Sequence, residues 1–179
     1  EVALPIRRCW SLALAAVLLV LCASPAHAKS FSLPEARVEA KVLPDGSVQV
    51  VEHLTYAFSG DFSGGYREIP LRYESLDGTE HSLSISDIEV WEGGREYQPG
   101  ASAELGSSGA PDTFGVADLG DDARIVWHYS AFDELRTFEV RYRLSGLAIA
   151  YDDVVDVNLR VWGDEWEQEL SVLSASMRW

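Results

Sequence analysis

The sequence predicts an all-β protein, folded as an antiparallel β-sandwich of immunoglobulin-like size and preceded by a cleavable signal peptide. After residue 28, apolar and polar side chains alternate through most of the chain, which is the pattern of half-buried strands. The alternating runs follow one another at intervals of about a dozen residues and are separated by glycine-rich connectors. No long segment carries a helical stripe, although 151–157 could form a short helical turn. These features favour two packed sheets.

Residues 1–28 are predicted to be a secretory signal peptide. Arg7 and Arg8 provide a positive amino-terminal region, 10–22 form an almost unbroken apolar run, and Ala26-His27-Ala28 offers small side chains to a signal peptidase. This order is typical of a cleaved leader. We therefore expect cleavage between Ala28 and Lys29, which leaves a single β-sandwich domain over 29–179.

Two alternative interpretations of the apolar run are less well supported. A transmembrane anchor needs ~20 apolar residues, and the run over 10–22 is shorter. A lipoprotein needs a small residue before its cysteine, whereas Leu21 precedes Cys22. Removal of the leader also removes Cys9 and Cys22, the only cysteines of the chain. The exported domain therefore has to rely on its hydrophobic core for stability.

The first predicted pair of strands covers 38–42 and 48–58. Between them, Pro44-Asp45-Gly46-Ser47 is a turn sequence, because proline presets φ and glycine accepts a positive φ. We expect these two strands to form a hairpin.

A second hairpin is predicted from 125–129 and 138–144, because the link 131–134 between these alternating runs is short. The stretch 100–120 is poor in large apolar residues, and we expect a mobile loop there. Further strands are expected at 82–91, 155–162 and 169–177.

The charge and the residue types of the chain exclude several functions. The formal net charge is −15 at pH 7, and a surface of that sign repels the phosphate backbone of nucleic acids. No cysteine follows residue 28, which excludes thiol catalysis and thiolate zinc sites there. His53, His81 and His128 lack the spacing of a metal site, and we expect His53 and His128 to lie on solvated strand faces. We identify no catalytic residue, no metal ligand and no cofactor site.

Three clusters of acidic residues, at 118–122, 152–156 and 164–167, are candidates for calcium. Calcium requires several oxygen ligands that converge from a loop of defined shape, and none of the clusters has calcium-loop spacing. A glycosidase requires one pair of carboxylates in a defined geometry, and no pair stands out among so many. We interpret the clusters as solvated turns.

Glu52 breaks the alternation, because it falls on the apolar face of its strand between Val50 and Leu54. A carboxylate in that position has to be paired or hydrogen-bonded, unless a bulge turns it outward. Arg67 and Arg136 are the candidate partners, and we expect Arg67, in the loop 60–70, to be the one that pairs with Glu52. We favour a structural ion pair that ties a loop to the sheet, with a functional pocket at Glu52 as the alternative. The residues selected for a structural or interaction role are Glu52, Tyr66, Arg67, Glu68 and Arg136.

Several motifs together resemble a known family. Asp45-Gly46-Ser47-Val48-x-Val50-x-Glu52 and Gly65-Tyr66-Arg67-x-Ile69-Pro70 are similar to the opening of the bacterial domain of unknown function 2207. Trp127-x-Tyr129 and Arg136-Thr137-Phe138-x-Val140-x-Tyr142 fit the middle of that domain. Tyr151-x-Asp153, Trp162 and Trp166 fit its last third. The resemblance covers about 31–177, and its strength lies in the ordered series of motifs.

The resemblance implies a location and leaves the mechanism open. Members of this family look like predicted membrane proteins, with a leader, an exported β domain and transmembrane helices, and no catalytic residues are assigned to them. The resemblance therefore implies that a membrane segment follows Trp179. The chain ends on an apolar strand position, which also leads us to expect a fragment of a longer membrane protein.

We therefore expect a non-enzymatic ectodomain of a membrane-anchored protein of the bacterial envelope. It would lie on the outer face of the cytoplasmic membrane, periplasmic or extracellular, and bind a protein or another envelope partner without a cofactor. One alternative is an exported hydrolase that acts on envelope glycans. Another is a carbohydrate- or calcium-binding module that uses exposed tryptophans such as Trp91 or Trp166.

Overall fold

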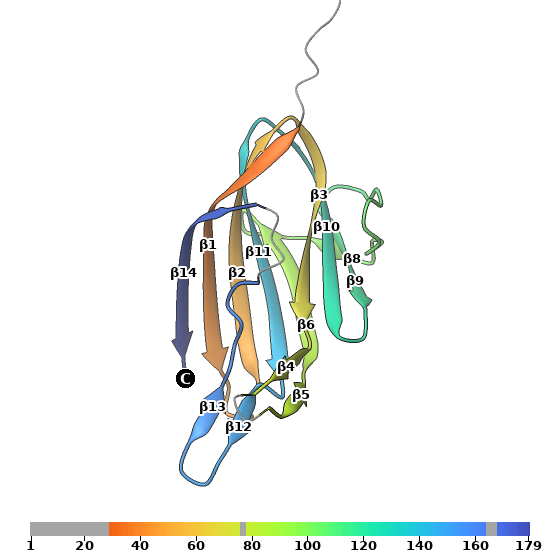
Figure 1. Cartoon of the computed structure of the whole chain (residues 1–179). Coiled ribbons are helices and arrows are strands. Elements are labelled where there is room, and N and C mark those ends of the chain that lie inside the picture. Colours follow the sequence, from red (N-terminus) through yellow and green to blue (C-terminus); the bar gives the residue numbers. More distant parts are fainter. Residues whose placement is uncertain (1–28, 76–77, 164–167) are drawn as a thin grey trace, which may run out of the picture.

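A computed structural model gives the structure of residues 29–75, 78–163 and 168–179. The predicted leader, 1–28, lies outside the described residues. Throughout the described part the chain is all-β, which confirms the predicted class (Figure 1). No helix that could cross a bilayer occurs in this part of the chain.

The strands follow one another along the chain without helical connections. In chain order they are β1 (Ser30–Val42), β2 (Val48–Ser59), β3 (Asp61–Pro70), β4 (Arg72–Glu74), β5 (Glu80–Ser82), β6 (Ser84–Glu92), β7 (Arg95–Glu96), β8 (Gln98–Pro99), β9 (Thr113–Asp118), β10 (Asp122–Phe132), β11 (Leu135–Ser145), β12 (Ala148–Ala150), β13 (Val155–Val157) and β14 (Leu170–Arg178).

Two larger sheets contain most of these strands. The first has six strands in the order β14-β1-β2-β11-β6-β7, and the second has four in the order β3-β10-β9-β8. Two small ribbons, β4-β5 and β12-β13, lie at one end of the molecule (Figure 1). The pairing is antiparallel as predicted, except that β14 runs parallel to β1 and β8 runs parallel to β9.

The predicted hairpin of β1 and β2 is confirmed. Its last pair is Val42 with Val48, and the turn between them has Gly46 at φ 80°. The Ser47 hydroxyl donates to Asp45 Oδ1 at 2.7 Å, and this hydrogen bond between two side chains of the turn stabilises it. The proline-glycine signal therefore identified the turn.

The second predicted hairpin is wrong, because β10 and β11 belong to different sheets. β10 pairs with β3 and β9, whereas β11 pairs with β2 and β6. The link between them passes from one sheet to the other, with Asp133 at φ 47° and its Oδ1 accepting from the Gly60 amide at 2.6 Å. Strands of two facing sheets alternate in the same way as the strands of a hairpin, since both bury one face in one core.

One hydrophobic core lies between the two larger sheets. Phe138 of β11 contacts Tyr129 and Trp127 of β10, with ring centroids 4.6 and 5.7 Å apart. Tyr56 of β2 stands edge-on to Phe138 at 5.8 Å. These rings join the sheets across the core, where large aromatic side chains bury the most apolar area.

The expected loop at 100–120 contains β9 and covers the outer side of β10. Ala101 donates its amide to Phe114 O at 3.0 Å. His128, expected at a solvated face, is 1% exposed, because this segment packs on it with Ser102 O 3.3 Å from Nε2. An alternating pattern marks the polar face of a strand but does not show whether another segment of the chain covers that face.

The carboxyl-terminal third differs from the prediction in two places. Residues 151–157 form no helical turn; Tyr151 instead donates its amide to Val154 O at 2.8 Å and closes the β12-β13 ribbon. The strand expected over 155–162 ends at Val157. The strand expected over 169–177 is observed as β14.

Candidate functional site

Glu52 and Arg67 form a buried ion pair between the two larger sheets. Arg67 Nε lies 2.9 Å from Glu52 Oε2, and Nη2 lies 3.3 Å from Oε1. Tyr142 of β11 donates its hydroxyl to the same Oε1 at 2.6 Å. The Glu52 side chain is 1% exposed, so the outward bulge does not occur. The predicted pairing with Arg67 is confirmed, but Arg67 lies on the strand β3 and not in the predicted loop.

The Glu52 carboxylate stabilises the positive charge of Arg67. Burial opposes ionisation of Arg67, but the nearby Glu52 carboxylate outweighs it and raises the pKa of Arg67. Burial, followed by the negative charge of Glu52, raises the pKa of Tyr142 well above its usual value. Tyr142 therefore remains a neutral donor. Arg67 Nη1 also donates to Glu68 O at 2.6 Å, which fixes the side chain against the backbone of β3.

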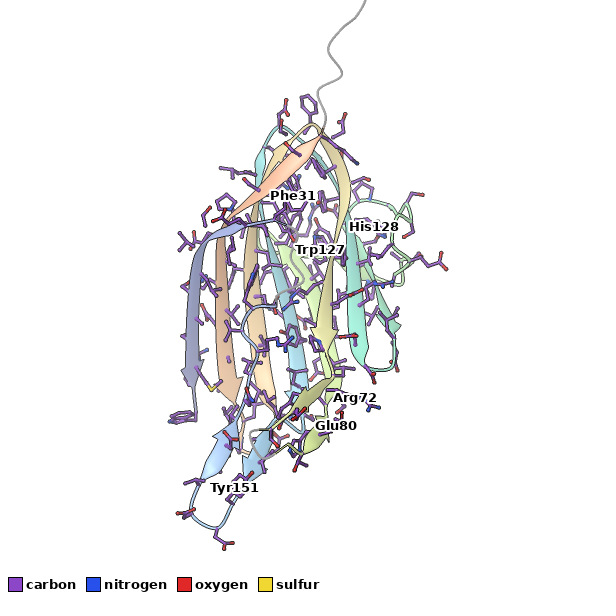
Figure 2. All side chains as sticks on the ribbon, in the orientation of Figure 1. Phe31, Arg72, Glu80, Trp127, His128 and Tyr151 are labelled. Carbon is purple, nitrogen blue, oxygen red and sulfur yellow. The ribbon has the colours of Figure 1, made fainter. Side chains whose placement is uncertain are left out.

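A cavity of about 540 Å³ lies beside Arg67, along β3. Its lining includes β3 from Gly64 to Pro70 and residues between β13 and β14, among them Asn158 and Leu159. Figure 2 labels Phe31 near one end of β3 and Arg72 near the other, and both residues line the cavity. The cavity therefore follows the length of this strand.

Aromatic rings from both sheets form the end of the cavity near Phe31. Phe62 lies 4.8 Å from Phe58 and 5.9 Å from Phe31, measured between ring centroids. Phe58 lies 5.5 Å from Tyr129 in turn. All these rings line the cavity. Sequence reasoning missed them, because the alternation shows only that they face inward and not that the two sheets leave space between them.

Two residues that line the cavity, Glu68 of β3 and Arg72 of β4, take part in ion pairs. Glu68 pairs with Arg124 at 2.6 Å, and Arg72 pairs with Asp121 at 2.5 Å. Tyr66 is 48% exposed. Among the residues selected from the sequence, Tyr66, Arg67 and Glu68 thus line one cavity, and Glu52 lies behind Arg67.

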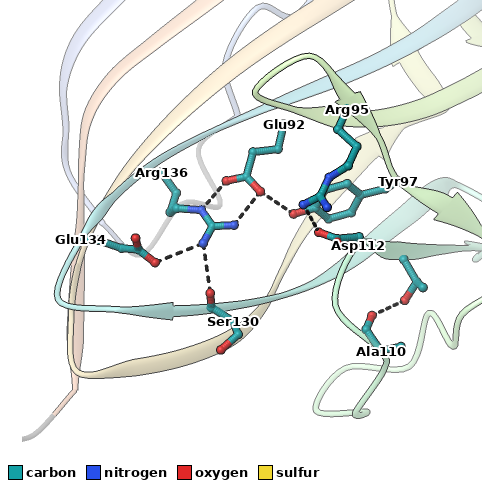
Figure 3. Close-up of polar contacts among 9 residues, drawn as sticks. Glu92, Arg95, Tyr97, Ala110, Asp112, Ser130, Glu134 and Arg136 are labelled. Carbon is teal, nitrogen blue, oxygen red and sulfur yellow. Dashed lines mark hydrogen bonds and ion pairs between the residues drawn. The ribbon is translucent and has the colours of Figure 1, made fainter.

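Arg136 is the exception, because it pairs with Glu92 of β6 and not with Glu52. Arg136 Nη2 lies 2.6 Å from Glu92 Oε2, and Nε contacts Oε1 (Figure 3). Its Nη1 donates to Ser130 O at 3.0 Å and to Glu134 at 3.1 Å. The guanidinium thus joins β11, β6 and β10 at one end of the core. The expectation that placed Arg136 near Glu52 is corrected by this geometry.

Tyr97 completes the Arg136 cluster, since its hydroxyl donates to Glu92 Oε2 at 2.7 Å. Burial opposes ionisation of Glu92, but the hydrogen bonds from Arg136 and Tyr97 outweigh it and hold the pKa of Glu92 below its usual value of 4.5. Nearby, Arg95 pairs with Asp112 at 2.7 Å (Figure 3). Hydrogen bonds join Arg136, Tyr97 and Glu92 to one another. We call this structural network the Glu92 clasp.

The remaining sequence candidates do not converge. No group of three or more histidine, cysteine or carboxylate side chains in the described part of the chain is placed to hold a metal ion. The acidic cluster at 164–167, with Trp166, lies outside the described residues. The guanidinium carbon of Arg141 lies 4.6 Å from the centroid of the Trp91 ring, and Trp91 Nε1 donates to Glu89 at 2.8 Å.

Residues 32–178 are similar to the family model described as predicted membrane protein (DUF2207) N-terminal domain. No curated protein matches the chain.

Proposed function

Because the chain belongs to the family of DUF2207 N-terminal domains of predicted membrane proteins, we propose that it is the exported binding domain of a bacterial envelope protein. In this proposal it is a non-enzymatic β-sandwich ectodomain, held at the outer face of the cytoplasmic membrane by segments outside this chain. Its partner is a protein or another component of the envelope.

The sequence supports the exported location. Arg7, Arg8 and the apolar run that follows have the order of a cleaved leader. After residue 28 the chain contains no cysteine, so its fold is independent of the redox state of the compartment. The net charge of −15 favours a solvated domain that stays clear of anionic lipid headgroups.

The cavity along β3 is the observation that supports a binding role. Its volume, about 540 Å³, falls within the range of ligand sites, and its lining combines aromatic rings with a few polar groups. The charged group beside it, Arg67, is already bound to Glu52 and to Glu68 O. Such a site offers a shaped surface with fixed polar groups, which suits recognition better than proton transfer.

The location is tested by cysteine labelling. Leu135 is 67% exposed, and Leu135→Cys introduces a thiol into a segment that has none. In intact cells that carry the full-length protein, a membrane-impermeant maleimide should label this variant, whereas the parent protein should stay unlabelled. Labelling that occurs only after the cells are permeabilised would contradict the exported location.

The binding role is tested by photo-crosslinking in native membranes. A benzophenone amino acid at position 66, on the rim of the cavity, should form a discrete adduct with a partner. The same group at position 132, which is exposed away from the cavity lining, is the matched control and should form none. Equal adducts from both positions, or none from position 66, would contradict a binding site at the cavity.

A further inference from the structure

β3 is an edge strand that lies in the wall of a cavity. It pairs with β10 on one side and is the terminal strand of its sheet in the described part of the chain. Consecutive residues from Gly64 to Pro70 line the cavity, although successive side chains of a strand point to opposite faces. The cavity therefore follows the free backbone edge of β3 and not only one of its faces.

The register shows which backbone groups of β3 point toward this free edge. Leu71 donates its amide to Asp121 O at 2.7 Å, so that pair is hydrogen-bonded and continues the antiparallel register of Pro70 with Asp122. In an antiparallel ladder, bonded pairs alternate with unbonded pairs. Residues 65, 67 and 69 therefore face β10, and residues 64, 66, 68 and 70 face the cavity edge.

Two side-chain contacts support this assignment. Tyr129 donates its hydroxyl to Gly64 O at 3.0 Å, and Arg67 Nη1 donates to Glu68 O at 2.6 Å. Both carbonyls belong to residues that the register turns away from β10. A carbonyl oxygen has two lone pairs, so each can still accept from a further strand. Pro70 also occupies an outward position, where its missing N–H costs no ladder bond.

Among the described residues, no strand pairs with this edge of β3, so that the edge can accept the backbone of another chain. Gly64 is exposed and has no side chain to obstruct an approaching strand. On the inner face, position 65 has no room for a side chain, because a Cβ there would lie 2.9 Å from the Trp127 ring. A strand laid against this edge would meet the amides of Gly64, Tyr66 and Glu68, at the spacing of a polypeptide backbone.

The inner face of such a strand would meet the aromatic part of the cavity. Side chains on the same face as Arg67 and Ile69 point toward the core, since both residues are buried. The cavity lining on that side is apolar and aromatic, with Phe31, Phe58 and Leu147 among its members. Every second side chain of an added strand would enter this space, which selects apolar residues at alternate positions.

We propose that the cavity takes an extended polypeptide segment, which adds to the four-stranded sheet along the free edge of β3 and places alternate apolar side chains among the aromatic rings. This inference rests on the proposed binding role and names its ligand class. Polypeptide is favoured over a glycan or an acyl chain because neither of these offers a repeating row of N–H and C=O groups.

A phage-displayed library of random peptides, selected on the immobilised protein, tests the inference. Selection should enrich peptides with apolar residues at alternate positions. Their synthetic forms should bind the wild type and Tyr66→Ala with similar affinity, because that variant keeps the backbone amide. Tyr66→Pro should weaken binding about tenfold or more, since proline removes the N–H and obstructs the edge.

Thermal unfolding shows whether Tyr66→Pro is folded as well as Tyr66→Ala is. The amide of Tyr66 lies outside the β3-β10 ladder, so Tyr66→Pro should melt within a few degrees of Tyr66→Ala. If Tyr66→Pro unfolds, the register on which the inference depends is wrong. The inference is also overturned if no peptide is enriched, or if enriched peptides bind Tyr66→Pro as well as Tyr66→Ala.

Two further probes separate this inference from the binding role itself. Chitohexaose represents a glycan and dodecylphosphocholine represents an acyl chain, and each is titrated while the amide signals of β3 are followed. If one of them shifts these signals and no peptide is enriched, strand addition fails and the binding cavity stands. If all three ligand classes fail and position 66 forms no crosslink, the proposed function fails as well.

Discussion

Arg67 Nε of β3 lies 2.9 Å from Glu52 Oε2 of β2, and this contact links the edge strand of the smaller sheet to the larger sheet. It lies beside the cavity, so the same pair that connects the sheets also holds the strand that lines the proposed site. A buried charge is tolerated there because the carboxylate has three hydrogen bonds, from two nitrogens of Arg67 and from Tyr142.

Removing either partner should leave a buried charge uncompensated. Glu52→Gln and Arg67→Met should each lower the free energy of unfolding by about 3–5 kcal/mol. The double variant should lose about 0.5–3 kcal/mol less than the sum, as measured by denaturant titration. Arg37→Met is the control, since the Arg37–Glu39 pair is exposed and should contribute at most about 1 kcal/mol. Additive losses at positions 52 and 67 would show that the two side chains do not meet.

The Tyr142 hydroxyl should contribute a measurable part of this stability. Tyr142→Phe removes a donor to a charged acceptor and should cost about 1.5–3 kcal/mol. Tyr73→Phe is a matched control, because within the described residues the buried Tyr73 hydroxyl has no hydrogen-bond partner. Thermal unfolding of the control should match the wild type to within about 0.5 kcal/mol. Equal losses in both variants would contradict the bond to Glu52.

The Glu92 clasp should make stability depend on acidic pH. The pKa of Glu92 is lower in the folded protein than its usual value of 4.5. Such a group stabilises the fold above its unfolded pKa and loses this effect as the pH falls through the folded pKa. The wild type should therefore lose stability below about pH 4.5 more steeply than Glu92→Gln. Parallel pH profiles of the two proteins would contradict the clasp.

The Trp127 ring should leave no room for a side chain at position 65. Gly65→Ala places a Cβ 2.9 Å from Trp127 Cζ2, and overpacking of this kind costs about 1–3 kcal/mol. Gly64→Ala is the comparison, because its Cβ would meet Trp127 O at 3.2 Å at an exposed position, and its cost should be smaller. Unfolding is followed by tryptophan fluorescence. A larger loss at position 64 than at 65 would contradict the packing.

Local signals in the sequence predicted the features that depend on neighbouring residues. The hairpin of β1 and β2 follows from its turn, and the buried pair follows from Glu52 on an apolar face. Arg67 was the preferred of the two candidate partners and is the one observed, whereas Arg136 pairs with Glu92. That acceptor is brought near only by the pairing of β6 with β11.

Features that depend on how the sheets face each other could not be predicted in this way. Alternation is the same for a hairpin as for facing strands, so the assignment of β10 and β11 to one hairpin was wrong. The burial of His128 depends on a covering segment that begins 27 residues earlier in the chain, at Ala101. The cavity depends on β3 lying at the edge of its sheet, which no local pattern specifies.

Hydrogen exchange of the β3 amides tests the central claim most directly, because it reads the free edge and its occupation in one experiment. In the free protein, the amides of residues 65, 67 and 69 should exchange slowly and those of 64, 66 and 68 rapidly. Binding of a selected peptide should slow exchange at 64, 66 and 68 and leave the other three unchanged. Uniform exchange along β3 in the free protein, or protection on binding that leaves these amides unaffected, would contradict a binding site at the β3 edge.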